Sequence, residues 1–147
     1  NEKITITDSN MTRFSISIDE ALDFILKAVE IGKGSEIFVP KLRAYSIMDV
    51  KDTLFDLLGK TDEEIIGVRV GEKLNEILIN QDEMKYSYEY QDMYLILDPS
   101  VQRFISPTNE FLERKKIENM TVYSSDAVEK IPKEELKKIF TDSKLLD

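Results

Sequence analysis

Two arginines lie in sequence contexts that could bind an anion. Arg13 stands between apolar neighbours in Met11-Thr-Arg-Phe14, and Arg69 stands in Gly67-Val-Arg-Val-Gly71 at the end of a β-branched run. A guanidinium can grip a phosphate with two parallel hydrogen bonds, and the flanking glycines would let the backbone approach a ligand. The alternative interpretation places each arginine on the solvated face of a half-buried strand.

The sequence offers little else that could perform chemistry. It contains no cysteine and no histidine, which excludes disulfides, thiolate metal sites and the commonest general base. The five glycines fit neither G-x-G-x-x-G nor a phosphate-binding P-loop, and no tyrosine has a lysine four residues later, the pair used by short-chain dehydrogenases. We therefore predict no catalytic residue, no metal site and no cofactor site within this chain.

Two other groups of residues have less specific interpretations. Asp62-Glu63-Glu64 and Asp82-Glu83 could be catalytic carboxylates or ligands of a hard cation, but acidic clusters in a chain of net charge −9 are usually solvated. The aromatic runs at 86–90 and 93–97 could stack on bases. Packing in a core is the stronger interpretation, because no basic residues are interleaved with them.

The composition indicates one globular domain. The chain has 147 residues, of which 41% are hydrophobic and 33% charged, enough to build a core. Its net charge of −9 argues against nucleic acid as a partner. No apolar run is long enough to span a bilayer and the first residues show no signal-peptide pattern, so we expect no membrane partner and a cytoplasmic location.

The elements that must position the arginines alternate along the chain. We expect strands at 3–7 and 11–18, followed by a helix at 19–31 behind a capping box made by Ser17 and Glu20. The helix is expected to bury one face, formed by Ala21, Leu22, Ile25, Ala28 and Val29. A strand at 36–40, closed by proline, comes next.

Helices and strands are also expected to alternate after residue 40. A helix at 47–58 lies between a cap at Ser46 and a stop at Gly59, with its apolar face formed by Ile47, Val50, Leu54, Leu57 and Leu58. We expect a strand at 65–70 and a short helix at 72–79, whose N-terminal N–H groups would favour an anion. A hairpin at 86–97 and a helix at 133–140 follow, which together predict an α/β fold with helices covering a sheet.

Three segments carry a resemblance to a known family. Met11-Thr-Arg-Phe14, Glu36-Ile-Phe-Val-Pro-Lys41 and Ile65-Ile-Gly-Val-Arg-Val-Gly-Glu-Lys-Leu-Asn-Glu-Ile-Leu-Ile79 resemble the C-terminal half of the UDP-N-acetylglucosamine 4,6-dehydratases of capsule synthesis and flagellin glycosylation. These enzymes are extended short-chain dehydrogenases. The resemblance is strong over residues 4–97 and weaker beyond. It implies a mixed α/β substrate-binding region, whose partner Rossmann domain precedes it in the family and is absent from this chain.

The resemblance also implies roles for particular residues. Arg13 and Arg69 would bind the UDP pyrophosphate, and Glu72 would accept hydrogen bonds from the ribose hydroxyls. Lys41 and Lys73 match family positions and are weaker substrate-binding candidates. One departure is Asn75, which stands where many family members have histidine and leaves the exact sugar open.

The implied activity belongs to a longer enzyme. The family uses NADP or NAD to oxidise C4 of UDP-N-acetylglucosamine or a related UDP-sugar, eliminates water across C5 and C6, and often inverts C5. Residues 1–97 would bind the UDP-sugar, and 98–147 would form a tail for interdomain or homo-oligomer contacts. This chain alone would be inactive and bind no cofactor. The alternatives are the substrate region of a UDP-sugar 4-epimerase or reductase, and a non-catalytic interaction module that kept the fold.

Overall fold

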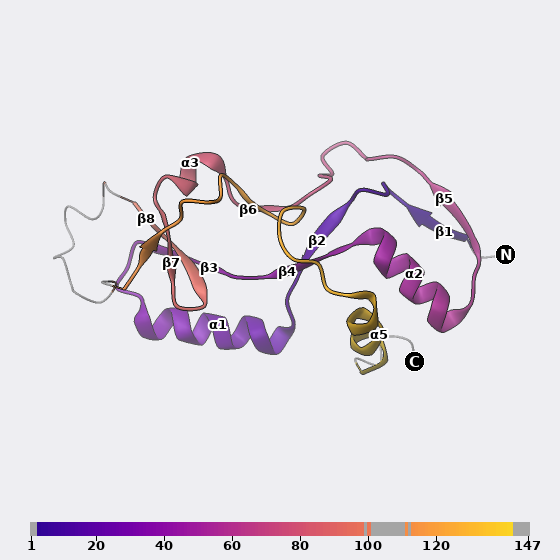
Figure 1. Ribbon diagram of the computed structural model, residues 1–147, viewed down its shortest axis with the longest axis horizontal. Helices are drawn as coiled ribbons and strands as arrows, with labels where there is room; N and C mark the ends of the chain where they lie inside the picture. The colour runs from indigo at the N-terminus through magenta and orange to yellow at the C-terminus, as the bar shows by residue number, and fades with distance from the viewer. Residues whose placement is uncertain (1–2, 99, 101–110, 112, 143–147) are drawn as a thin grey trace. The chain divides into compact units, whose positions relative to one another are not determined.

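The computed structural model describes residues 3–98, 100, 111 and 113–142, which form two compact units (Figure 1). Unit 1 gathers residues 43–76 with the described parts of 1–15 and 125–147, and unit 2 gathers 16–42 with the described parts of 77–124. The parts of the expected tail at 99, 101–110, 112 and 143–147 lie outside the described residues. The division of roles between 1–97 and 98–147 stays a prediction.

Unit 1 combines two strand pairs with two helices. Strand β1 (Lys3–Ile6) runs parallel to β5 (Asp62–Ile65), and β2 (Thr12–Ser15) runs antiparallel to β4 (Arg43–Ser46). Helix α2 (Ile47–Leu58) follows β4 directly, and α5 (Lys133–Asp142) packs against it. The buried apolar side chains of this unit are Ile6, Met11, Ala44, Ile131 and Leu136.

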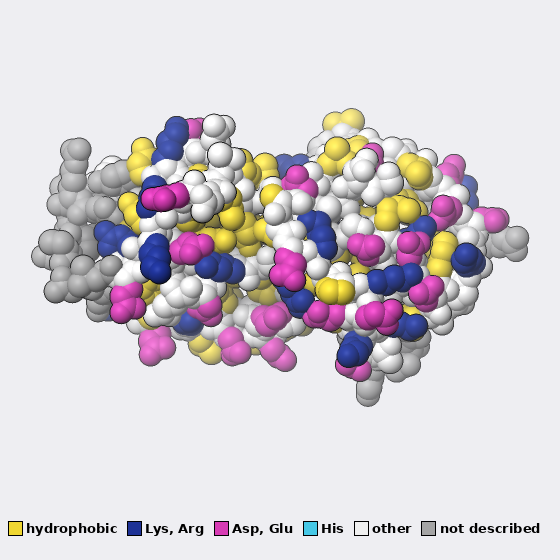
Figure 2. Space-filling model, viewed as in Figure 1, with side chains coloured by type: hydrophobic (Ala, Val, Ile, Leu, Met, Phe, Trp, Pro, Cys, Tyr) yellow, Lys and Arg dark blue, Asp and Glu magenta, His cyan; other side chains and the backbone are white. Residues whose placement is uncertain are grey.

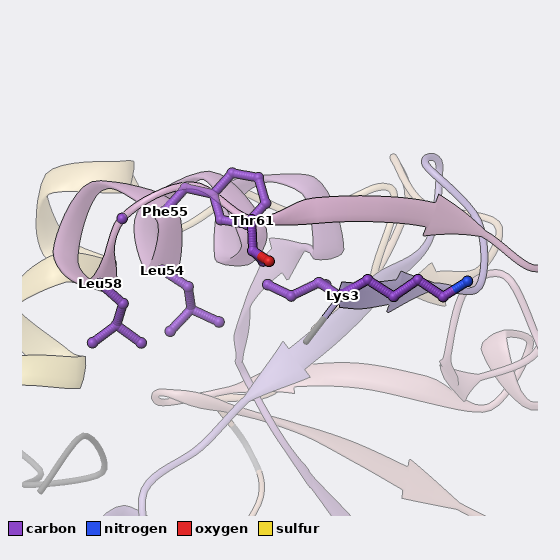
Figure 3. A pocket seen from close by; sticks show the side chains of 7 residues that line it. Lys3, Leu54, Phe55, Leu58 and Thr61 are labelled. Atoms are coloured by element: carbon purple, nitrogen blue, oxygen red, sulfur yellow. The ribbon is translucent and has the colours of Figure 1, made fainter. Parts of the chain in front are cut away.

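A cavity of about 360 Å³ lies between α2 and β1 in unit 1. Figure 3 shows Leu54 and Leu58 extending from α2 on one side of it, with Phe55, Thr61 and Lys3 also in its lining. Apart from the ammonium of Lys3, which pairs with Glu64, the lining carries no charged group. Because this ammonium is already paired, the lining offers no unpaired charge for acid–base chemistry or phosphate binding.

Unit 2 is a four-stranded antiparallel sheet covered by one helix. The sheet has the order β3 (Glu36–Pro40), β8 (Met93–Leu97), β7 (Ser87–Tyr90) and β9 (Lys115–Lys116). Helix α1 (Ile18–Ile31) packs Phe24 and Ile31 against a core made by Tyr90, Met93, Leu95, Leu97 and Phe111. The short strand β6 (Ile77–Ile79) pairs with β10 (Tyr123–Ser124), and α3 (Gln81–Met84) follows β6.

The mixed α/β class and several elements agree with the sequence. Both sides of the Ser17–Glu20 capping box are made, and α2 has the predicted bounds, with Ser46 accepting from the Asp49 N–H and Gly59 at the C-cap. The strand at 36–40, the hairpin and the C-terminal helix are also confirmed. The aromatic runs pack in the core of unit 2, as expected.

Three expectations are wrong. The strand predicted at 65–70 ends at Ile65, because only 62–65 pair with β1, and Gly67 then takes a positive φ of 80°. No helix forms at 72–79, so the anion site expected from its N–H groups is lost; residues 77–79 are strand β6 instead. The face of α1 that was expected in the core is largely exposed, as is Leu58 at the end of α2.

Candidate functional site

The candidate site is the irregular loop at 66–76 of unit 1, between β5 and β6. The Ile66 N–H donates to the Ile6 carbonyl at 2.9 Å, which fixes the start of the loop against β1. A tight turn follows: the Glu72 N–H donates to the Arg69 carbonyl at 3.0 Å, and the Glu72 carboxylate accepts from the Arg69 N–H at 3.2 Å. Gly71 has φ 86°, the positive value that the third residue of a type II turn requires.

This turn presents Arg69 to solvent. Its guanidinium is exposed and has no hydrogen-bond or ion-pair partner in the part of the chain that the structure describes. The flanking Val68 and Val70 are exposed as well, and Val70 is fully so. A planar cation held on a short turn without a protein partner is suited to bind an anion from solution.

Arg13 has a different environment. It lies in β2 with a side chain that is 22% exposed, and its Nη1 donates to the carbonyls of Thr12 at 2.7 Å and Leu74 at 3.0 Å. Its Nη2 donates to the Lys73 carbonyl at 2.9 Å, and its Nε lies 3.6 Å from the Glu76 carboxylate. Since a guanidinium has five N–H groups, one on Nη2 remains for a ligand. Arg13 therefore holds the second half of the loop in place.

A buried polar network supports the same part of the loop. The Thr12 hydroxyl donates to the Asn75 side-chain oxygen at 2.8 Å and lies 2.7 Å from the Ser125 hydroxyl, which in turn accepts from the Glu76 N–H at 2.9 Å. The Thr12 N–H donates to the Leu74 carbonyl at 3.0 Å. Sequence patterns missed Thr12, Glu76 and Ser125, because the partners are up to 113 positions apart.

The remaining candidates are placed in both units. Glu72 is half-buried and accepts from the Thr7 hydroxyl at 3.5 Å, while the exposed ammonium of Lys73 has no partner among the described residues. The structure thus brings Arg13, Arg69, Glu72 and Lys73 to one loop. Lys41 belongs to unit 2.

The surroundings of Lys41 are charged and aromatic. Its Nζ lies 3.5 Å from the Glu89 carboxylate and 5.0 Å from the centroid of the Tyr94 ring. Burial raises the pKa of the Tyr94 phenol, which keeps that ring neutral beneath the ammonium. Lys41 also lines a cavity of about 280 Å³ in unit 2, together with the ion pair between Lys27 and Asp92.

The described residues show neither a group of metal ligands nor a glycine-bearing turn from strand to helix. No group of three or more acidic side chains in the described ranges could hold a metal ion. The acidic clusters noted in the sequence are partnered instead, Glu63 with Lys51, Glu64 with Lys3 and Asp82 with Lys85. The junctions from strand to helix at Ser17, Ser46 and Asn80 carry no glycine, which a dinucleotide-binding turn needs, so a nicotinamide cofactor does not fit there.

The chain is similar in sequence and fold to known proteins. Residues 1–98 match the family described as polysaccharide biosynthesis protein, and the chain therefore belongs to this family. A solved structure, that of Pen from Bacillus thuringiensis, is 31% identical, covers 99% of this chain and 41% of its own, and superposes with a TM-score of 0.77.

Three relatives show the range of the family. The UDP-N-acetylglucosamine 4,6-dehydratase (inverting) of Campylobacter jejuni serotype O:2 is 37% identical over 85% of this chain. A UDP-glucose 4-epimerase of Rickettsia rickettsii is 33% identical over 94%, and an uncharacterized membrane protein of Methanocaldococcus jannaschii is 33% identical over 95%. The chain spans only 38–40% of the length of these relatives. It resembles the C-terminal region of the dehydratase.

No helix among the described residues is long and apolar enough to cross a membrane.

Proposed function

We propose that the loop at 66–76 binds the diphosphate of UDP-N-acetylglucosamine or a related UDP-sugar, as part of an NAD(P)-dependent 4,6-dehydratase. The observation that supports this most is the exposed Arg69 guanidinium, which has no partner among the described residues and stands on a turn fixed by Gly71 and Glu72. The relatives named as UDP-sugar enzymes support the substrate class.

Each candidate residue has a proposed role. Arg69 grips the pyrophosphate with its planar fork, and Arg13 adds its remaining Nη2 N–H while it holds the loop. Glu72, whose oxygens have free lone pairs beyond the Arg69 N–H and Thr7 bonds, accepts from the ribose hydroxyls. Lys73 and Lys41 are weaker contributors to substrate binding.

The hydrogen bonds from Arg69 can contribute a large part of the free energy of UDP binding. Charge-assisted hydrogen bonds contribute roughly 1.5–3 kcal/mol each. A bidentate grip by Arg69 therefore supplies about 3 kcal/mol or more, a substantial share of the roughly −8 kcal/mol of a micromolar complex. Removing this one arginine should therefore weaken UDP binding by an amount that a titration can measure.

The chemistry is proposed to lie outside this chain. Besides Glu72, the titratable side chains of the loop are the exposed Lys73 and Glu76, whose carboxylate faces Arg13, and we assign the acid–base chemistry to none of them. The cofactor, NADP or NAD, is assigned to the Rossmann domain that the relatives' extra length would provide. This chain alone is proposed to be inactive, and the complete enzyme to form a homo-oligomer in the cytoplasm and to serve polysaccharide or capsule precursor synthesis. Inversion at C5 is part of the proposal, and product analysis by NMR would test it.

Calorimetric titration of the chain with UDP tests the binding site. We expect saturable binding, with affinity falling on the order of 100-fold in Arg69→Ala, which corresponds to about 3 kcal/mol. The matched control is Lys85→Ala, which removes the exposed lysine at the C-cap of α3, whose ammonium pairs with Asp82. Equal affinities for UDP in Arg69→Ala and Lys85→Ala would contradict the proposal.

The similarity to the Rickettsia protein favours a second candidate, the substrate region of a UDP-sugar 4-epimerase. The two activities differ in product, since only the dehydratase loses the C6 oxygen. Mass spectrometry separates them by the loss of one water from the sugar. A complete enzyme that returns a sugar of unchanged mass would support the epimerase. A chain that binds no UDP and yet captures a protein partner through its C-terminal third would support the interaction module.

A further inference from the structure

The segment that precedes α5 contains Lys130, a half-buried lysine whose side chain binds backbone carbonyls. Its ammonium donates to the carbonyls of Ser125 and Asp126, both at 2.9 Å, and to that of Val128 at 2.8 Å. Since an ammonium has three N–H groups, none remains for a carboxylate or for a ligand. Lys130 therefore closes the turn at 125–128.

This environment differs from that of several other lysines of the chain. On the face drawn in Figure 2, lysine and arginine side chains lie among acidic ones, and Lys3, Lys85 and Lys133 each pair with a carboxylate. Exposed ion pairs of this kind contribute little to stability. Hydrogen bonds from a charged donor are stronger than neutral ones, so the three bonds of Lys130 can fix the backbone that they hold.

The residues on both sides of Lys130 are anchored on β4. The Ala44 N–H donates to the Glu129 carbonyl at 3.0 Å, and the Ile131 N–H donates to the Ala44 carbonyl at 2.7 Å. Ala44 and Ile131 are both buried. Strand β4 pairs in turn with β2, which carries Arg13 (Figure 1). The ammonium therefore reaches back to the turn from a fixed point beside the strands that hold Arg13.

The first residue of the turn binds the end of the candidate loop. Ser125 is fully buried, and its N–H donates to the Glu76 carbonyl at 2.8 Å. Its hydroxyl accepts from the Glu76 N–H at 2.9 Å and lies 2.7 Å from the Thr12 hydroxyl. Both backbone groups of Glu76 thus depend on the position of Ser125, and the Glu76 carboxylate lies 3.6 Å from Nε of Arg13.

We infer that Lys130 is a positioning residue for the nucleotide loop. By holding the Ser125 carbonyl it fixes the position of Ser125, which in turn fixes the backbone of Glu76 at the end of the loop. The inference rests on the proposed function in one respect, namely that the ligand of this loop is a UDP-sugar. It assigns the segment at 125–131 to the binding region, beyond the boundary expected at residue 97.

Lys130→Met tests this role, because it keeps most of the stem and removes all three donors. We expect UDP affinity to fall about tenfold, because the loop loses a support that holds it in its binding form. The Glu76 amide should exchange about tenfold faster. Lys130→Arg should restore most of both, since a guanidinium can still donate to these carbonyls.

The matched control is Lys133→Met, which breaks the ion pair with Asp56 in the same unit and leaves the turn intact. With both variants titrated well below their melting temperatures, Lys133→Met should retain the UDP affinity and the Glu76 protection of the natural chain. This comparison separates a role in positioning the loop from a role in general stability.

A double variant shows whether Lys130 acts through Ser125. Ser125→Ala removes the hydroxyl that accepts from Glu76, and its loss of UDP affinity should not add to that of Lys130→Met when the two are combined. Additive losses would overturn the inference, as would unchanged UDP affinity in Lys130→Met or equal losses in Lys130→Met and Lys133→Met. An unfolded Lys130→Met would do the same, because the lysine would then stabilise unit 1 as a whole.

The exchange measurement keeps the inference separate from the proposed function. If the natural chain binds no UDP, the proposed function fails, but the Glu76 amide still reports on the loop. Faster exchange of that amide in Lys130→Met alone would then support the positioning role, and equal exchange in the natural chain and Lys130→Met would refute it.

Discussion

Arg13 is predicted to stabilise unit 1 as well as to assist binding. Arg13→Ala removes hydrogen bonds to the Leu74 and Lys73 carbonyls, which join β2 to the loop across about sixty positions of sequence. The bond to the Thr12 carbonyl is local and holds no loop. The Leu74 carbonyl keeps the Thr12 N–H as a donor, whereas the Lys73 carbonyl loses its protein partner.

The expected loss follows from these two bonds. Each is charge-assisted and should contribute about 1.5 kcal/mol, the lower end of the usual range, because the side chain is 22% exposed and water competes. Arg13→Ala should therefore lower the free energy of unfolding by about 3 kcal/mol, which corresponds to roughly 6–12 °C in melting temperature for a chain of this length. Arg13→Lys should lose less, since an ammonium can still reach one carbonyl.

Thermal unfolding followed by circular dichroism measures the shift, and hydrogen exchange locates it. In Arg13→Ala, the amides of Glu76 and Ser125 should exchange faster, because both belong to the network that the arginine steadies. Arg69→Ala serves as the control, as its guanidinium has no described partner and its removal should change the free energy of unfolding by less than about 0.5 kcal/mol. Our interpretation of Arg13 fails if Arg13→Ala and Arg69→Ala have the same melting temperature and the Glu76 amide exchanges at the same rate in both.

Two further perturbations have definite expected outcomes. In Gly71→Ala the added methyl group meets no neighbouring atom, but the alanine must hold a φ of 86°. We therefore expect the free energy of unfolding in denaturant to fall by about 1–2 kcal/mol and UDP binding to weaken. Unchanged UDP affinity would mean that the turn does not shape the site. The hydrogen bond from Lys133 lowers the pKa of Asp56 in the folded chain below its ordinary value of 3.8. The ion pair therefore stabilises the fold fully above pH 3.8, and this stabilisation is lost as the pH falls through the pKa of Asp56 in the folded chain. The melting temperatures of the natural chain and Asp56→Asn should therefore differ at neutral pH and converge in acid, and a constant difference would contradict this pairing.

Sequence patterns were sufficient to predict the elements whose bounds are set by residues at their own ends. Helix α2 begins and ends as predicted because the Ser46 side chain caps its first turn and Gly59 takes a φ of 92° after its last. The hairpin was predictable for the same reason, since its aromatic strands carry their own turn between them. In such elements the deciding contacts lie within a few residues.

The candidate loop could not be predicted in this way, although its key residues could. Arg69 and Glu72 were identified from their flanking glycines and from the family resemblance, but the segment was divided between a strand and a helix. The apolar residues at 74, 77 and 78 follow helical spacing. However, Thr12, Arg13 and Ser125 form hydrogen bonds with the backbone of 73–76, which is not helical. Long-range hydrogen bonds therefore decide its conformation, and no local pattern contains them.

Helix α1 shows that the spacing of apolar residues predicts an apolar face but not the surface against which that face packs. The sequence correctly predicts an apolar face on this helix, because Leu22, Ile25 and Val29 recur at helical spacing. It cannot tell which apolar surface faces them, and the core of unit 2 uses Phe24 and Ile31 instead. Periodicity therefore identifies an apolar face on a helix, whereas only the packed structure shows whether the described residues cover that face.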